Sequence, residues 1–209
     1  MDTTNISAAE ALDRLRQGNQ RFVDDARQSD AATQARRQAL VAGQRPFAIV
    51  LACSDSRVPA ELVFDQGLGD LFVVRVAGNV VAPSIVGSVE FAAATFGTPL
   101  VVVMGHTYCG AVDATLKAIQ QGQQAPSDNI RDIVERIRPA AETVVSVGAS
   151  LPRERLLDEA IRANVRNSVS HLRHGSRVLE DRVAKGLLQI VGAEYDLESG
   201  RVDIFDIAS

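Results

Sequence analysis

Hydrophobic and polar positions repeat with two different periods along this chain. Apolar residues recur at helical spacing over 7–24, where "SAAE" places Ser7 and Glu10 at the positions of a capping box. Short and nearly continuous apolar runs, such as "PFAIVLA" and "PLVVVMG", instead predict buried strands. Further helices are expected over 31–42, 84–97, 110–121, 127–148, 153–173 and 176–185.

The order of these elements predicts an α/β fold. Strands are expected over 46–52, 69–79 and 99–105, and apolar strands that alternate with helices imply a central, mostly parallel sheet flanked by helices. The closing stretch "LLQIVGAEYDLESGRVDIFDI" is typical of two strands joined by a turn, which adds an antiparallel edge. We expect residues 1–209 to form one domain that begins with an N-terminal helical arm.

The charge and the apolar content of the chain argue against binding to nucleic acid and against a membrane span. A net charge of −4 argues against nucleic-acid binding, and no apolar stretch approaches the roughly 20 residues of a membrane span. The first residues, "MDTTNISAAEALDRL", do not have the pattern of a secretory signal, so a cytoplasmic, reducing location is expected. Two reduced cysteines in such a setting indicate metal binding, catalysis or simple burial.

Residues that could bind a metal or catalyse a reaction follow the ends of two predicted strands. Cys53 follows the first strand in "LACSDSRVPAE", and His106 and Cys109 follow the third in "GHTYCGA". If these parallel strands are neighbours, their carboxyl ends bring the three side chains around one point. Two thiolates and an imidazole suit zinc, and a three-ligand set keeps the fourth position open for catalysis unless Asp55 closes it. Either cysteine taken alone is more often a small core residue.

The paired signatures C-x-D-x-R and H-x-x-C resemble those of the β-class carbonic anhydrases. The similarity covers nearly the whole chain, from "GNQRF" through "CSDSRVPAELVFDQGLGDLFVVRVAGN", "GSVEFA" and "GHTYCGAV" to "VGAEYDLESG". It implies the zinc ligands Cys53, His106 and Cys109 and a catalytic dyad of Asp55 and Arg57. In the implied reaction, zinc-bound hydroxide attacks CO2 to give bicarbonate and a proton, while the dyad orients the hydroxide. The resemblance also implies a homodimer or homotetramer, in which the helical arm at 1–45 packs on the partner subunit.

The same resemblance indicates a substrate pocket beside the metal. The matching positions are Gln44, Phe72, Ala77, Phe91 and Gly110. Ala77 stands where valine is usual and Phe91 where tyrosine is usual, so we expect a roomier and less polar pocket. Simple core packing is the alternative for the two phenylalanines, and a solvated turn is the alternative for Gln44.

Other functions compete with CO2 hydration. The same fold and metal site would serve a carbon disulfide or carbonyl sulfide hydrolase, and a structural zinc would suit a non-catalytic binding module. Cysteine phosphatase chemistry needs C-x5-R, whereas Pro59 stands six positions after Cys53. Dinucleotide binding is also disfavoured, because "GLGDLF" has Phe72 where the third glycine belongs.

Overall fold

The computed structural model describes residues 5–28, 33–148 and 150–205. The helices are α1 (Ala8–Val23), α2 (Gln34–Ala39), α3 (Ala60–Val63), α4 (Pro83–Thr95), α5 (Gly110–Gln121), α6 (Asp128–Val147), α7 (Arg153–His174) and α8 (Arg177–Ala184). The strands are β1 (Ala48–Ala52), β2 (Leu71–Arg75), β3 (Leu100–His106), β4 (Gln189–Tyr195) and β5 (Val202–Phe205). Two short 3-10 turns are η1 (Leu40–Ala42) and η2 (Ala77–Asn79).

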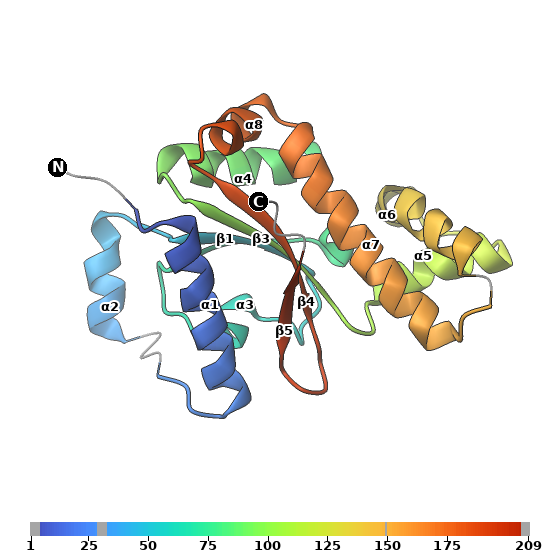
Figure 1. Cartoon of the computed structure of the whole chain (residues 1–209), viewed down its shortest axis with the longest axis horizontal. Coiled ribbons are helices and arrows are strands. Elements are labelled where there is room, and N and C mark those ends of the chain that lie inside the picture. The colour runs from blue at the N-terminus through green and yellow to red at the C-terminus, as the bar shows by residue number, and fades with distance from the viewer. Residues whose placement is uncertain (1–4, 29–32, 149, 206–209) are drawn as a thin grey trace.

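The sheet has the order β2-β1-β3-β4-β5, and only β5 runs antiparallel to its neighbour (Figure 1). Every residue of β1 and β3 is buried. Successive residues of these strands point to opposite faces, so an apolar residue is needed at every position. The predicted fold class, a mostly parallel sheet with an antiparallel edge and flanking helices, is confirmed.

Different helices cover the two faces of the sheet. On one face α1 buries Ala11, Leu12 and Leu15 against the strands, and the capping box of Ser7 and Glu10 starts this helix as predicted. The other face is covered by α4, α7 and α8, whose buried side chains share a cluster with β1 and β3. Figure 1 shows α5 and α6 beyond α7, where they form a separate cluster that includes both cysteines.

Most predicted elements are present, with two differences. The predicted helix over 31–42 is α2 followed by η1 in its described part, and residues 31 and 32 lie outside the described residues. The predicted strand over 69–79 is wrong at its end, because β2 stops at Arg75 and η2 follows. Gly78 has a φ of 68°, a left-handed value that is incompatible with a continued strand.

Candidate metal centre

Three potential ligands meet at the carboxyl end of the sheet. Cys53 directly follows β1, His106 ends β3, and Cys109 immediately precedes α5. Because β1 and β3 are paired in parallel, these positions come together, as the sequence leads us to expect. Their ligand atoms all lie within 4.8 Å of one another, and the three side chains are buried. These separations suit a single ion, since Zn–S and Zn–N bonds are about 2.0–2.3 Å long.

The imidazole of His106 tests whether this group fits a metal. Its Nδ1 lies 2.9 Å from the carbonyl oxygen of Thr107, which favours the tautomer with the proton on Nδ1. Its Nε2 then carries a lone pair, and this buried atom has no hydrogen-bond partner among the described residues. A buried polar atom left unpaired is costly, so an electron-pair acceptor such as zinc satisfies it. The donor set therefore fits the metal that the family resemblance implies.

The two thiols influence each other's ionisation. A hydrogen bond from Cys109, together with one from the Gly78 amide, lowers the pKa of Cys53 against the opposing effect of burial. The same contact and burial raise the pKa of Cys109, because a second thiolate next to the first is unfavourable. Both sulfurs must lose their protons to bind a divalent ion, so ion binding releases protons.

Asp55 and Arg57 form a bidentate ion pair beside the candidate ligand His106. The Nε and Nη2 atoms of Arg57 donate to the two carboxylate oxygens of Asp55 at 2.9 and 2.8 Å, and the Arg57 amide also donates to Asp55 at 2.9 Å. These hydrogen bonds lower the pKa of Asp55, so the carboxylate stays ionised. Its Oδ2 lies 4.0 Å from Nε2 of His106, which places an acceptor at the edge of the ligand group.

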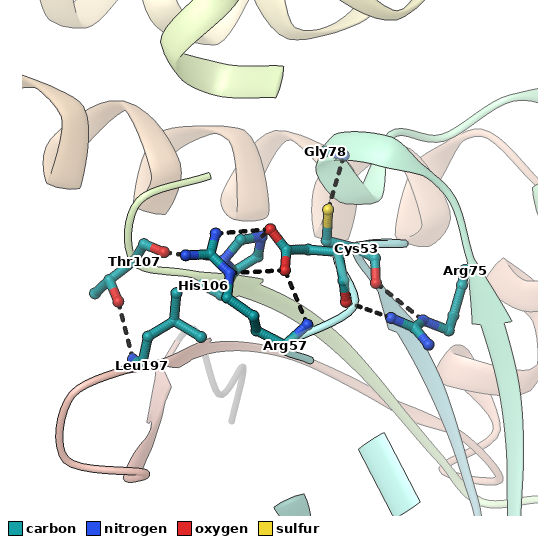
Figure 2. Close-up of polar contacts among 8 residues, drawn as sticks. Cys53, Arg57, Arg75, Gly78, His106, Thr107 and Leu197 are labelled. Atoms are coloured by element: carbon teal, nitrogen blue, oxygen red, sulfur yellow. Dashed lines mark hydrogen bonds and ion pairs between the residues drawn. The ribbon is translucent and has the colours of Figure 1, made fainter. Parts of the chain in front are cut away.

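The backbone around Cys53 is held by the last residue of β2 and by the turn η2 that follows. Arg75 donates from Nε to the carbonyl oxygen of Cys53 at 3.0 Å and from Nη2 to that of Asp55 at 2.6 Å (Figure 2). The amide of Gly78 donates to the sulfur of Cys53 at 3.3 Å. Neither contact was anticipated from the sequence. The glycine within "VRVAGN" was the available signal, because a glycine near the end of a strand often marks a turn.

Comparison with known proteins decides the family. The family model described as carbonic anhydrase matches residues 48–202, about three quarters of the chain. The chain belongs to the β-carbonic anhydrase family. Carbonic anhydrase 2 of Mycobacterium tuberculosis is 42% identical over 202 residues, which cover 97% of this chain and 95% of the relative. A carbonic anhydrase of Mycolicibacterium smegmatis is also 42% identical, over 96% of this chain and 94% of its own length.

A solved structure agrees with this assignment. The β-carbonic anhydrase CcaA superposes with a TM-score of 0.76 at 27% sequence identity, covering 94% of this chain and 88% of CcaA. The resemblance to the β-class carbonic anhydrases and the predicted enzyme class, carbonic anhydrase, are thus confirmed. This family is zinc-dependent in general, which agrees with the chemistry of the Cys–His–Cys group.

The pocket residues predicted for this carbonic anhydrase fall into two sets. Ala77 precedes the Gly78 amide that contacts Cys53, and Gly110 directly follows Cys109, so both lie beside the ligand group. The remaining residues have other neighbours: Gln44 lines a surface pocket with residues of α2 and η1, and Phe72 contacts Phe91. Gln44 precedes β1 whereas Cys53 follows it, which puts the two at opposite ends of the strand.

The two phenylalanines pack together on the sheet face covered by α4. Phe72 lies near the amino end of β2, opposite Ile49 of β1. Its ring centroid is 6.3 Å from that of Phe91, which in turn stacks edge-on against Phe96 at 5.6 Å. The three rings form an aromatic cluster, although Phe91 remains 53% exposed. Their role in substrate binding stays a prediction.

Proposed function

We propose that this chain catalyses the reversible hydration of CO2 to bicarbonate, with zinc held by Cys53, His106 and Cys109. The observation that carries the proposal is the unpaired, buried Nε2 of His106, which faces two cysteine sulfurs beside an ionised carboxylate. When bound, zinc acts as a Lewis acid and lowers the pKa of the water molecule that it coordinates, so hydroxide is available near neutral pH.

We assign the orienting role to Asp55. Because its carboxylate is ionised, it offers only acceptor atoms, and a hydroxyl group beside the ligand group must donate its hydrogen to Oδ2. The oxygen lone pairs then point away from Asp55 and toward CO2. Arg57 holds both carboxylate oxygens, which keeps Asp55 from turning into the position where substrate must sit.

Stopped-flow CO2 hydration on protein of known zinc content tests this assignment. With one zinc per chain, we expect strong activity in the wild type and a loss of about 100-fold or more in Asp55→Ala, because orientation is lost while the ligands remain. Asp132→Ala is a matched control, since Asp132 makes a similar bidentate pair with Arg136 on the surface of α6. Zinc-loaded protein without hydration activity would contradict the proposal and favour carbon disulfide turnover or a binding role.

We also propose that the protein self-associates as a dimer, with or without further assembly into a tetramer. Among the described residues, several large apolar side chains are exposed around the amino-terminal half, including Val41 at 87% and Leu68 at 40%. Gln44, Phe72 and Phe91 also lie away from the ligands of their own chain, so a pocket that contains them needs a second copy. The packing of the arm at 1–45 on that partner belongs to the same proposal.

The oligomeric state is tested by analytical ultracentrifugation of wild type and Val41→Glu. If Val41 is covered by a second copy, the charged variant dissociates; an exposed valine of a monomer would tolerate the change without a shift in mass. Among the described residues, no helix is both long and apolar enough to cross a membrane. The cytoplasmic location remains a prediction from the sequence.

A further inference from the structure

The turn η2 presents one backbone amide to the sulfur of Cys53 (Figure 2). Gly78, at the centre of the turn, has a left-handed φ, and a Cβ on it would lie 2.8 Å from Cδ1 of Ile137 and 3.1 Å from Cβ of Ala111. Glycine is therefore required for both conformation and space. The turn packs against β1, β3, α5 and α6. Its geometry sets the direction of the Gly78 amide.

Two buried polar residues of α7 hold this turn. Asn164 donates from Nδ2 to the carbonyl oxygen of Gly78 at 2.8 Å, and Ser168 donates from Oγ to that of Asn79 at 3.1 Å. Asn164 is 1% exposed and Ser168 is 2% exposed. They stand one helical turn apart on a face that otherwise buries apolar residues such as Ile161, Val165 and Val169. Burial of a polar group is unfavourable unless it has a hydrogen-bond partner. The carbonyl groups of the turn provide the partners of both side chains.

We propose that Asn164 is a positioning residue for the ligand Cys53, and that Ser168 supports it. The amide that contacts sulfur and the carbonyl that accepts from Asn164 both belong to Gly78, on either side of its Cα. Asn164 thus fixes the backbone dihedrals of Gly78 and, through them, the direction of the N–H···S hydrogen bond. Hydrogen bonds to a ligating sulfur alter its bond to the metal, and outer groups of this kind typically change metal affinity by 10- to 100-fold.

This inference rests on the proposed function, because it requires Cys53 to be a metal ligand. Wild-type protein therefore comes first: zinc content and the sulfur-to-metal charge-transfer band of the Co²⁺-substituted protein establish thiolate ligation. If wild type binds neither ion through sulfur, the proposed function is wrong and the positioning role of Asn164 is overturned with it. If it does, any failure of the variants concerns the positioning role alone.

The decisive experiment compares Asn164→Ala with Val169→Ala. Val169 is a suitable control because it is fully buried on the same helix but packs in the apolar cluster shared with α4 and α8. We expect Asn164→Ala to release zinc to a chromogenic chelator about 10- to 100-fold faster and to shift the Co²⁺ charge-transfer band. Val169→Ala should lower the melting temperature without either change. Equal release rates and unshifted bands in both variants would show that Asn164 only stabilises the fold.

Ser168→Ala keeps the proposal testable where Asn164→Ala does not fold. Its hydroxyl contacts the next carbonyl of the turn, so we expect the same two changes at smaller size, a rise of severalfold in zinc release and a shift in the same direction. A Ser168→Ala protein that folds and matches wild type in both measurements would contradict the supporting role of Ser168. In the absence of a folded Asn164 variant, it would also overturn the inference as a whole.

Discussion

The two loops that carry the ligands are held in different ways. The first loop, Cys53–Arg57, bears one ligand and the ion pair of Asp55 and Arg57, and its backbone is held by the Arg75 side chain and the turn η2. The second loop, His106–Cys109, bears two candidate ligands. Its Thr107 amide donates to the carbonyl oxygen of Tyr195 at the end of β4. The amide of Leu197, between β4 and β5, donates to the side chain of Thr107 (Figure 2).

The ion pair of the first loop is more exposed than the candidate ligands of either loop. In the first, the side chains of Asp55 and Arg57 are 20% and 54% exposed, whereas His106 is fully buried and Cys109 is 1% exposed. In the second, Tyr108 has a left-handed φ of 59° and its hydroxyl donates to Glu198 at 2.7 Å. The first loop thus presents the ion pair to solvent, whereas the three candidate ligands of both loops are buried. Substitutions should affect activity and metal retention differently in the two loops.

Substitution of a cysteine ligand should impair both activity and zinc retention, whichever loop carries it. We expect Cys53→Ser and Cys109→Ser both to lose stoichiometric zinc, with activity near background, because thiolates supply two of the three protein ligands. Metal analysis after gel filtration and CO2 hydration assays measure the two effects. Full zinc retention in either variant would show that its cysteine is buried in the core without binding metal.

Arg57→Gln should reveal the reactive role of the first loop. The variant removes both side-chain hydrogen bonds to the Asp55 carboxylate and leaves only the one from the Arg57 amide, so we expect kcat to fall about 10- to 100-fold with zinc content unchanged. Asp132→Asn weakens a similar bidentate pair with Arg136 on the surface of α6 and provides the control. A normal kcat in Arg57→Gln would mean that the ion pair only fixes the loop.

Arg75→Gln should produce a smaller change in the same loop. Without the guanidinium, two carbonyl groups that flank Ser54 lose their shared donor, and Asp55 is less well placed. We expect kcat of zinc-loaded protein to fall about 10-fold with little change in KM, and Arg75→Lys to recover part of the loss. An effect on folding stability alone, measured by chemical denaturation, would contradict this positioning role.

Thr107→Val should have the smallest effect and distinguish the second loop from the first. The substitution keeps the shape of the side chain but removes the acceptor for the Leu197 amide, at a cost of about 1 kcal/mol in the free energy of unfolding. We expect kcat of the zinc-loaded variant to stay within twofold of wild type. A large fall in kcat at full zinc occupancy would show that the second loop also controls the reaction.

The sequence predicts the parts of this molecule that depend on local patterns. Continuous apolar runs identify β1 and β3, the capping box identifies the start of α1, and the order of strands places Cys53 near His106. The paired motifs also point to the ion pair of Asp55 and Arg57, because the two residues are neighbours in sequence as well as in space.

Other features depend on tertiary contacts that no local pattern contains. The apolar residues of "VVRVAGN" continue the strand pattern, yet packing against α5 and α6 turns the backbone at Gly78. Asn164 and Ser168 resemble ordinary polar positions of a helix until the partner carbonyls become visible. The surroundings of Gln44 also depend on tertiary contacts, because it lines a pocket together with residues of α2, η1 and the segment before β2.

The complete burial of β1 and β3 has a consequence for the lifetime of the metal complex. Amide hydrogens in fully buried inner strands exchange with solvent mainly through global unfolding, whereas exposed loops open at much lower free energy. Two of the proposed ligands, Cys53 and His106, follow or end these strands. We therefore expect a metal held by Cys53 and His106 to leave on the timescale of global unfolding, as slowly as the amide hydrogens of β1 and β3 exchange.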